Sequence, residues 1–391
     1  MRKSIFIALL LCVSIVLAAC GSSTSATLPS DKTSTTADSS TPAGASPVAG
    51  TPAAASPEAT SSSTAATPEA TADASPSAST GSSSGDLSKV TIATGFKPSM
   101  NSAAIYLAAE KGYYKDAGLD VTVKDGSNPD LLAQIGTGGV DFGVSTGDTV
   151  VSARAAGVPV QMVMQLFTKY PVGLIYLANS GKTINTPADL KGMNIGVSQL
   201  SGSTYYGLLA LLQAGHLTKD DVKITTIGFT ELEAVSQKRV DAAMTYMSNE
   251  PVNAKDIGIE TNAVQVNDYV QIVSSGIVTS ESMIKDHPDV VQKVVDATVK
   301  AMNEELQNPD EAFGATIKRM PELTADKDKQ TQRDILDETL KYQQPVADHP
   351  TGWTNPDSWK TTTDFLKSVN VIDKEVDPTT CYTNQFVEQA K

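Results

Sequence analysis

Residues 90–123 read VTIATGFKPSMNSAAIYLAAEKGYYKDAGLDVTV, and this stretch decides the fold. Its β-rich start predicts a strand over residues 90–93, and the apolar spacing over residues 102–111 predicts an amphipathic helix. Gly112 is the natural end of that helix, because glycine adopts the left-handed backbone of a helix C-terminus without steric cost. A second strand is predicted over residues 119–123. The stretch is therefore a strand–helix–strand unit, the building block of an α/β fold.

The same alternation of strand and helix patterns continues to residue 278. Further strands are predicted over residues 140–144, 160–166, 171–177, 194–197, 222–227, 242–246, 264–266 and 270–278, with helices over residues 129–135, 146–157, 203–214 and 231–238. Beyond this point the pattern is helical, over residues 288–307, 309–318, 326–342 and 357–367. This order is typical of an α/β protein with parallel sheets.

Two chain crossings, near Tyr176 and Ser274, divide the pattern into two α/β lobes. The first predicted lobe comprises residues 87–176 and 275–391, and the second comprises residues 177–274. The C-terminal helices are expected to pack on the first lobe. No sequence repeat relates the lobes, so we expect them to share topology only. Because open α/β sheets bind ligands at the carboxyl ends of their strands, a cleft between the lobes is the predicted binding site.

The N-terminus indicates where the protein works. Arg2 and Lys3 precede an apolar run over residues 5–16, which is too short for a lasting membrane span. The run closes on Leu-Ala-Ala-Cys at residues 17–20, which resembles the lipobox of bacterial lipoproteins. In such proteins cleavage precedes the cysteine, which then carries the lipid. The resemblance implies that residues 1–20 are a lipoprotein signal peptide and that Cys20 is the lipidated N-terminus; an ordinary secretory peptide is the alternative.

Residues 21–86 consist mainly of Ser, Thr, Ala and Pro, with almost no large apolar side chain. Such a segment cannot bury enough apolar surface to offset the entropy of ordering it. It is therefore predicted to be a disordered linker that holds the folded domain, residues 87–391, away from a membrane.

Composition limits the function of the folded domain. Residues 87–391 carry 27 basic and 38 acidic side chains, which argues against nucleic acid or an anionic membrane surface as a partner. Cys381 is the single cysteine of this domain, so neither an internal disulfide nor a cysteine-based metal cluster is expected. His216, His287 and His349 lack metal-ligand spacing, and no catalytic or nucleotide-binding motif is present. We therefore expect no metal, no cofactor and no enzymatic activity.

Several local motifs together resemble one family. Residues 95–114 (GFKPSMNSAAIYLAAEKGYY), followed by GLDV at 118–121, are similar to the opening of the SsuA/THI5-like (NMT1-type) substrate-binding proteins. The family's later signatures have counterparts in GGVDFGV at residues 138–144, TPADLKG at 186–192, RVDAA at 239–243 and NEP at 249–251. The likeness extends over residues 89–320, and the final helices match in character only.

The resemblance implies a type II periplasmic-binding-protein fold that delivers a small-molecule ligand to the permease and ATPase of an ABC importer. The most similar branches bind thiamine pyrimidine precursors or riboflavin, whereas other branches bind alkanesulfonates, taurine or nitrate-like anions. The THI5 synthases of this family use a cysteine-rich motif and a histidine that this sequence does not match. A lipid-anchored monomeric receptor is the expected form, and a sensor partner of a membrane kinase is an alternative with the same binding chemistry.

Three groups of residues follow predicted strands on the cleft side. In the first, Phe96, Lys97 and Asn101 precede the helix that carries Tyr106. An aromatic ring and an amide there can stack on a planar ligand and hydrogen-bond to it. Packing of the loop is the alternative role of Phe96.

The second group lies at a predicted helix N-terminus and comprises Ser201, Ser203, Thr204 and Tyr205. Free backbone N–H groups at such a position attract anions or ring acceptors, and Tyr205 or Tyr206 could form one wall of a stacked site. A plain N-cap by Ser201 or Ser203 is the alternative.

The third group comprises Tyr246, Asn249 and Glu250. A carboxylate held in the cleft could accept two N–H bonds from an aminopyrimidine or isoalloxazine edge, and it would repel an anion. Asn249 as an N-cap and Glu250 as a dipole-compensating residue are the alternatives.

The remaining candidates follow the strand over residues 140–144 or lie near the first crossing. They carry weaker signals, and Asp148 is equally interpretable as a helix-capping residue. These candidates are Ser145, Thr146, Asp148, Phe167 and Tyr170. Lys97 is the one cation among all these positions, which favours a neutral heteroaromatic ligand over a sulfonate.

Overall fold

The computed structural model describes residues 87–390. The predicted signal peptide, Cys20 and the predicted linker lie outside the described residues. In the described part, no helix combines the length and the apolar character that a membrane crossing requires.

The first lobe is built on a five-stranded sheet with the order β2-β1-β3-β10-β4. Its strands are β1 (Ser88–Ala93), β2 (Leu119–Lys124), β3 (Phe142–Thr146), β4 (Val160–Gln165) and β10 (Ser275–Ser280). β1 pairs in parallel with β2 and β3, whereas β10 runs antiparallel to β3 and β4. The carboxyl ends of β1 and β3 therefore lie at the same edge of the sheet.

Helices cover this sheet, and the long C-terminal ones pack mainly on the same lobe. α9 contacts α1, α2 and β2, and α12 contacts α4. The helices of the lobe are α1 (Ala103–Glu110), α2 (Tyr113–Asp116), α3 (Leu131–Gly136), α4 (Gly147–Ala155), α8 (Glu281–Asp286), α9 (Pro288–Gln307), α10 (Pro309–Ile317), α11 (Asp326–Leu340) and α12 (Pro356–Ser368).

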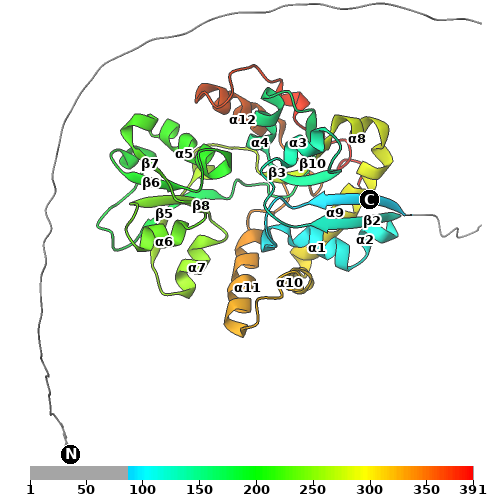
Figure 1. The fold of residues 1–391 in the computed structure, drawn as a ribbon, viewed down its shortest axis with the longest axis horizontal. Helices are drawn as coiled ribbons and strands as arrows, with labels where there is room; N and C mark the ends of the chain where they lie inside the picture. Colours follow the sequence, from blue (N-terminus) through cyan, green and yellow to red (C-terminus); the bar gives the residue numbers. More distant parts are fainter. Residues whose placement is uncertain (1–86, 391) are drawn as a thin grey trace, which may run out of the picture. The chain divides into compact units, whose positions relative to one another are not determined.

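The second lobe repeats the architecture with the strand order β7-β6-β8-β5-β9. Its strands are β5 (Val172–Leu177), β6 (Asn194–Val197), β7 (Lys223–Thr226), β8 (Ala242–Tyr246) and β9 (Thr261–Gln265). Its helices are α5 (Gly202–Ala214), α6 (Glu231–Ser236) and α7 (Glu250–Asp256). These elements form the green part of the ribbon in Figure 1.

The two lobes share topology, as expected. In the first lobe β1 pairs in parallel with β2 and β3, and in the second lobe β6 pairs in parallel with β7 and β8. The strand that follows a crossing, β10 or β5, runs antiparallel beside β3 or β8. Asp141 accepts the Thr91 backbone N–H at 2.8 Å, and Asp241, at the matching position, accepts the Asn194 backbone N–H at 2.8 Å. An aspartate just before β3 thus links that strand to β1, and an aspartate just before β8 links that strand to β6.

Two features of the sheets differ from the expectation. The sheets are mixed and not parallel, because β5 and β10, the strands that follow the crossings, run against their neighbours. The structure also places β5 in the second sheet, which moves the first crossing from Tyr176 to residues 166–171. β5 is buried along its whole length, so its sequence is a continuous apolar run that does not reveal which sheet it joins.

The second crossing occupies residues 266–274, and β10 begins five residues later than the predicted strand over 270–278. The C-terminal helices also reach the second lobe. α11 contacts α7 and lies beside it in Figure 1, and Lys327 of α11 forms an ion pair of 3.4 Å with Asp256. Gln213 of α5 donates to Ser368 of α12 at 2.8 Å. The lobes therefore touch at several places besides the crossings.

Candidate functional site

Large apolar side chains are exposed where strands of the two lobes end. Phe96 follows β1, Leu200 follows β6 and Phe229 follows β7, with exposed fractions of 39%, 62% and 67%. They are three of the six large hydrophobic residues that are exposed within residues 87–390. Exposed apolar groups gathered at the carboxyl ends of strands are typical of a ligand site in an α/β protein.

Phe96 and Phe229 meet across the two lobes. Their ring centroids are 5.4 Å apart with an interplanar angle of 62°, an edge-to-face arrangement. Each phenylalanine follows a glycine with a positive φ, Gly95 at 74° and Gly228 at 63°, a conformation that glycine adopts without steric cost. Phe229 was not a candidate from sequence, although the Gly-Phe pair two residues after a strand occurs in both lobes.

Buried polar groups hold the loop that carries Phe96. The Thr94 hydroxyl donates to the Phe96 carbonyl at 2.8 Å and lies 3.0 Å from Asp125. Asp125 in turn accepts the Tyr106 hydroxyl at 2.6 Å and the Arg319 guanidinium at 2.9 Å. Tyr106 is buried and therefore supports the loop instead of facing a ligand.

Two glutamates lie near this aromatic pair. Glu231 is the first residue of α6 and is 7% exposed; Glu250 is the first residue of α7 and is half-buried. Burial, with the nearby Glu250 charge, raises the pKa of Glu231 to about 7. Burial also raises the pKa of Glu250. A hydrogen bond of 2.5 Å from Thr245 and the charge of Lys97 act in the opposite direction and lower this pKa. We call Phe96, Lys97, Phe229, Glu231 and Glu250 the acidic–aromatic cluster. Glu231 was not a candidate from sequence either.

A second group surrounds Asp148, whose carboxylate is completely buried. It accepts hydrogen bonds from the Tyr170 hydroxyl at 2.5 Å, from the Thr149 backbone N–H at 2.6 Å and from Thr146. The Ser203 hydroxyl of the second lobe lies 3.4 Å from Asp148 and 3.0 Å from Thr146. We call these five residues the Asp148 network. It joins α4, the first crossing and α5.

The Asp148 network changes the roles expected for two candidates. Tyr170 is 1% exposed, and its hydroxyl oxygen also lies 2.9 Å from the Ser203 carbonyl oxygen, so its ring offers no free face. Asp148 does accept a first-turn N–H of α4, as a capping residue would, but it also connects the lobes. Tyr246 is half-buried beside this network, and burial followed by the Asp148 charge raises the pKa of its phenol to about 12.

The candidates at the start of α5 are differently placed. Ser201 is exposed at the N-cap position and its side chain makes no capping hydrogen bond. Thr204 is buried and lies 2.8 Å from the Ser198 hydroxyl. Tyr205 is half-buried, with its ring 6.1 Å from the buried Tyr206. Of these residues, Ser201 and Tyr205 keep polar or aromatic surface exposed.

Three further candidates pack against polar neighbours. Asn101 accepts hydrogen bonds from Ser248 at 3.4 Å and from Thr339 at 3.2 Å, which links the first loop to β8–α7 and to α11. Asn249 occupies the N-cap position of α7 without a capping bond, and its side-chain oxygen lies 3.2 Å from the Ser248 hydroxyl. The Ser145 hydroxyl lies 2.7 Å from that of Thr149, and Phe167 is 2% exposed.

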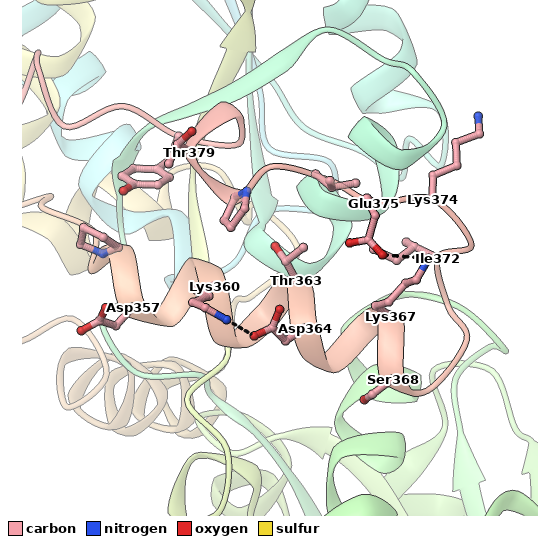
Figure 2. Close-up of a pocket in the computed structure, with 14 residues that line it drawn as sticks. Asp357, Lys360, Thr363, Asp364, Lys367, Ser368, Ile372, Lys374, Glu375 and Thr379 are labelled. Atoms are coloured by element: carbon pink, nitrogen blue, oxygen red, sulfur yellow. Dashed lines mark hydrogen bonds and ion pairs between the residues drawn. The ribbon is translucent and has the colours of Figure 1, made fainter.

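Two surface pockets lie elsewhere. The larger, about 610 Å³, is formed by α12 and the segment after it (Figure 2). Its charges neutralise one another, since Lys360 pairs with Asp364 at 2.5 Å and Lys367 with Glu375 at 3.4 Å. A second pocket of about 460 Å³ is lined by residues of both crossings, Lys169 and Gln271 among them. Neither pocket is lined by a member of the acidic–aromatic cluster or of the Asp148 network.

The histidines and the cysteine take no part in these groups. His287 is the N-cap residue of α9, and His349 stacks on Trp353 with centroids 3.6 Å apart. Cys381 is buried, which raises the pKa of its thiol to about 11. Within residues 87–390, no group of three or more His, Cys, Asp or Glu side chains is arranged to hold a metal ion.

Comparison with known proteins identifies the family. Riboflavin-binding protein RibY of Chloroflexus aurantiacus is 34% identical over 306 residues, which cover 77% of this chain and 86% of that protein. The 4-amino-5-hydroxymethyl-2-methylpyrimidine phosphate synthase THI11 of Saccharomyces cerevisiae is 31% identical over 163 residues, which cover 40% of this chain and 45% of the synthase.

A solved structure has a similar fold, and a family model matches part of the sequence. The crystal structure of the periplasmic aliphatic sulphonate binding protein SsuA from Escherichia coli superimposes with a TM-score of 0.61 at 17% identity, over 76% of this chain and 92% of SsuA. This likeness confirms the expected periplasmic-binding-protein fold. A model described as NMT1/THI5 like matches residues 99–312. The chain belongs to the NMT1/THI5-like family.

Proposed function

We propose that this protein is an extracytoplasmic solute-binding lipoprotein that captures a flat heteroaromatic vitamin, riboflavin, between its two lobes and delivers it to an ABC importer. The likeness to RibY over most of both chains favours riboflavin over the other ligands of the family. A thiamine pyrimidine precursor is the second candidate, and a sulfonate is the least favoured, because the acidic–aromatic cluster contains two carboxylates and one lysine.

The meeting of Phe96 and Phe229 carries this proposal. Both rings are exposed, and they come from loops of different lobes. A planar ring system inserted between them would replace the edge-to-face contact with stacking on both rings and would remove apolar surface from water. A ligand held in this way contacts both lobes and therefore stabilises the form in which they approach each other.

Binding and release require the lobes to move about the two crossings at residues 166–171 and 266–274. A ligand that contacts both lobes shifts the population towards the closed form, because it binds that form more tightly. The closed form is then the one that docks on the permease, which works with its ATPase. The protein acts as a carrier and not as an enzyme, and it acts as a monomer.

Anchoring belongs to the same proposal. Cys20 carries the lipid, and the linker over residues 21–86 gives the domain freedom to open, close and reorient beside its permease. Because a tethered carrier is confined to a small volume around its permease, the tether raises the effective concentration of the carrier at the permease.

Titration with three ligands tests the proposed function. The protein is expected to bind riboflavin with quenching of flavin fluorescence, because stacking on aromatic rings quenches the flavin. Calorimetry with 4-amino-5-hydroxymethyl-2-methylpyrimidine and with taurine provides the comparison. Tighter binding of the pyrimidine would replace riboflavin by the second candidate. Binding of taurine alone would refute the proposal of a heteroaromatic ligand.

Removal of one aromatic ring is expected to weaken the ligand without affecting the fold. Phe229→Ala should raise the Kd for riboflavin about tenfold, since an aromatic contact contributes roughly 0.5–1.5 kcal/mol beyond the area it buries. Unfolding should be unchanged, because the ring is 67% exposed. Ile257→Ala is the matched control, as Ile257 is 60% exposed in the same lobe and lies at the far end of α7. An unchanged Kd in Phe229→Ala would exclude this ring from the site.

A further inference from the structure

Glu231 is a buried carboxylate whose charge has little compensation. It is 7% exposed, and within residues 87–390 the only hydrogen-bonding group that acts on its carboxylate is its own backbone N–H. A buried carboxyl group without external donors is costly unless it holds a proton or receives hydrogen bonds from a ligand. Glu231 begins α6, two residues after Phe229, and therefore lies next to the proposed binding site.

Glu250 brings a second carboxylate to the same place. α6 contacts α7, and the charge of Glu250 acts on Glu231. Glu250 receives one hydrogen bond from Thr245 and the attraction of Lys97, which is exposed on the opposite lobe. The nearby Arg319 is already paired with Asp125. The acidic–aromatic cluster is therefore rich in acceptors and poor in positive charge.

We propose that Glu231 and Glu250 form an acidic pair that selects the unphosphorylated vitamin: it accepts hydrogen bonds from the hydroxyl or N–H groups of a neutral ligand and excludes the phosphate ester of the same molecule. This selection rests on the proposed function, because it concerns the ligand of the same site. It assigns a role to Glu231, which lies outside the family motifs of this sequence.

The chemistry of the two ligands explains the expected selectivity. Riboflavin and its 5′-phosphate share the ring system, so stacking on Phe96 and Phe229 does not distinguish them. The phosphate adds about two negative charges and no donor that the ionised carboxylates could use. Repulsion between these charges and the two carboxylates therefore opposes binding of the phosphate ester.

The protonation of Glu231 contributes to the same selectivity. Burial raises the pKa of Glu231 to about 7, so this carboxyl group is partly protonated around neutral pH. A protonated Glu231 can also donate one hydrogen bond, so a polyhydroxyl chain, which both donates and accepts, is a suitable partner.

The test compares the Kd for riboflavin with the Kd for riboflavin 5′-phosphate. Both are measured by flavin fluorescence at pH 7.5 with the wild type, Glu231→Gln, Glu250→Gln and the double variant. Glu233→Gln is the matched control, because Glu233 lies on the same helix and is exposed. We expect the wild type and the control to bind riboflavin at least tenfold more tightly than the phosphate. The double variant should reduce this ratio at least fivefold.

The possible results distinguish a failure of discrimination against the phosphate ester from a failure of riboflavin binding itself. A wild type that binds both flavins equally, or a double variant with an unchanged ratio, would overturn the selection and leave riboflavin binding intact. A wild type that binds neither flavin would overturn both. Thermal unfolding of each variant verifies its fold, and the Gln variants are expected to be at least as stable as the wild type, since they remove charge from a buried place.

Discussion

Asp148→Ala is expected to lower the free energy of unfolding by about 3 kcal/mol, because it deletes the acceptor of several buried hydrogen bonds at once. The Asp148 carboxylate is completely buried and receives the Tyr170 hydroxyl at 2.5 Å and the Thr149 N–H at 2.6 Å. Alanine leaves the Thr149 N–H without this acceptor and opens a cavity between the lobes. Urea unfolding followed by circular dichroism measures the loss.

Two further variants separate the contributions of the network. Asp148→Asn keeps the shape and one oxygen acceptor while removing a charge whose burial raises the pKa of the carboxyl group, so it should cost less than half as much as alanine. Ser203→Ala removes only the hydroxyl that reaches Thr146 and Asp148 from the second lobe, and about 1 kcal/mol is expected. A loss below 1 kcal/mol in Asp148→Ala would contradict the role given to the network.

Local sequence signals were sufficient for most of the elements of the fold. β6, β8 and α9 begin and end at the predicted residues, and α10 begins at the predicted proline. These elements have strong local determinants: proline fits the first turn of a helix, and short β-rich runs bounded by polar residues form strands. The pairing of strands depends instead on the whole sheet, which explains why β5 was assigned to the wrong lobe.

The candidate site was predicted less completely, for a different reason. Glu250 and Phe96 are predicted from sequence because each lies within a recognisable family motif shortly after a strand. Phe229 and Glu231 follow β7, a short and partly exposed strand, and lie outside those motifs. From sequence alone, Asp148 is equally interpretable as a capping residue. Its partners Tyr170 and Ser203 lie 22 and 55 residues further along the chain. Such contacts arise from tertiary packing and have no local signal.

Glu305→Gln is expected to stabilise the protein increasingly as the pH rises from 4.5 towards 8, and to have little effect near pH 4.5. Glu305 lies on α9 and is completely buried, and within the described residues neither of its carboxyl oxygens has a hydrogen-bond partner. Burial raises the pKa of this carboxyl from 4.5 to about 8. The native state therefore keeps a proton that the unfolded state has already released.

The sign of the pH dependence follows from this difference. Between pH 4.5 and 8 the native state binds more protons at Glu305 than the unfolded state does, so the stability that is fully present below pH 4.5 is lost as the pH rises towards 8. At about 1.4 kcal/mol for each pH unit, the loss reaches roughly 4 kcal/mol near pH 7.5. Glutamine has the same shape and cannot ionise, so it should recover most of that loss.

Glu304→Gln supplies a control with the opposite sign on the neighbouring residue. A hydrogen bond from Tyr113, and next one from Lys111, lower the pKa of Glu304, so its contribution is present above its ordinary pKa and is lost as the pH falls. Unfolding by urea at pH 5, 6, 7 and 8 should show Glu305→Gln gaining stability over the wild type as the pH rises, while Glu304→Gln stays equal or loses. A Glu305→Gln curve parallel to the wild type would show that Glu305 ionises normally, which its burial without a partner does not permit.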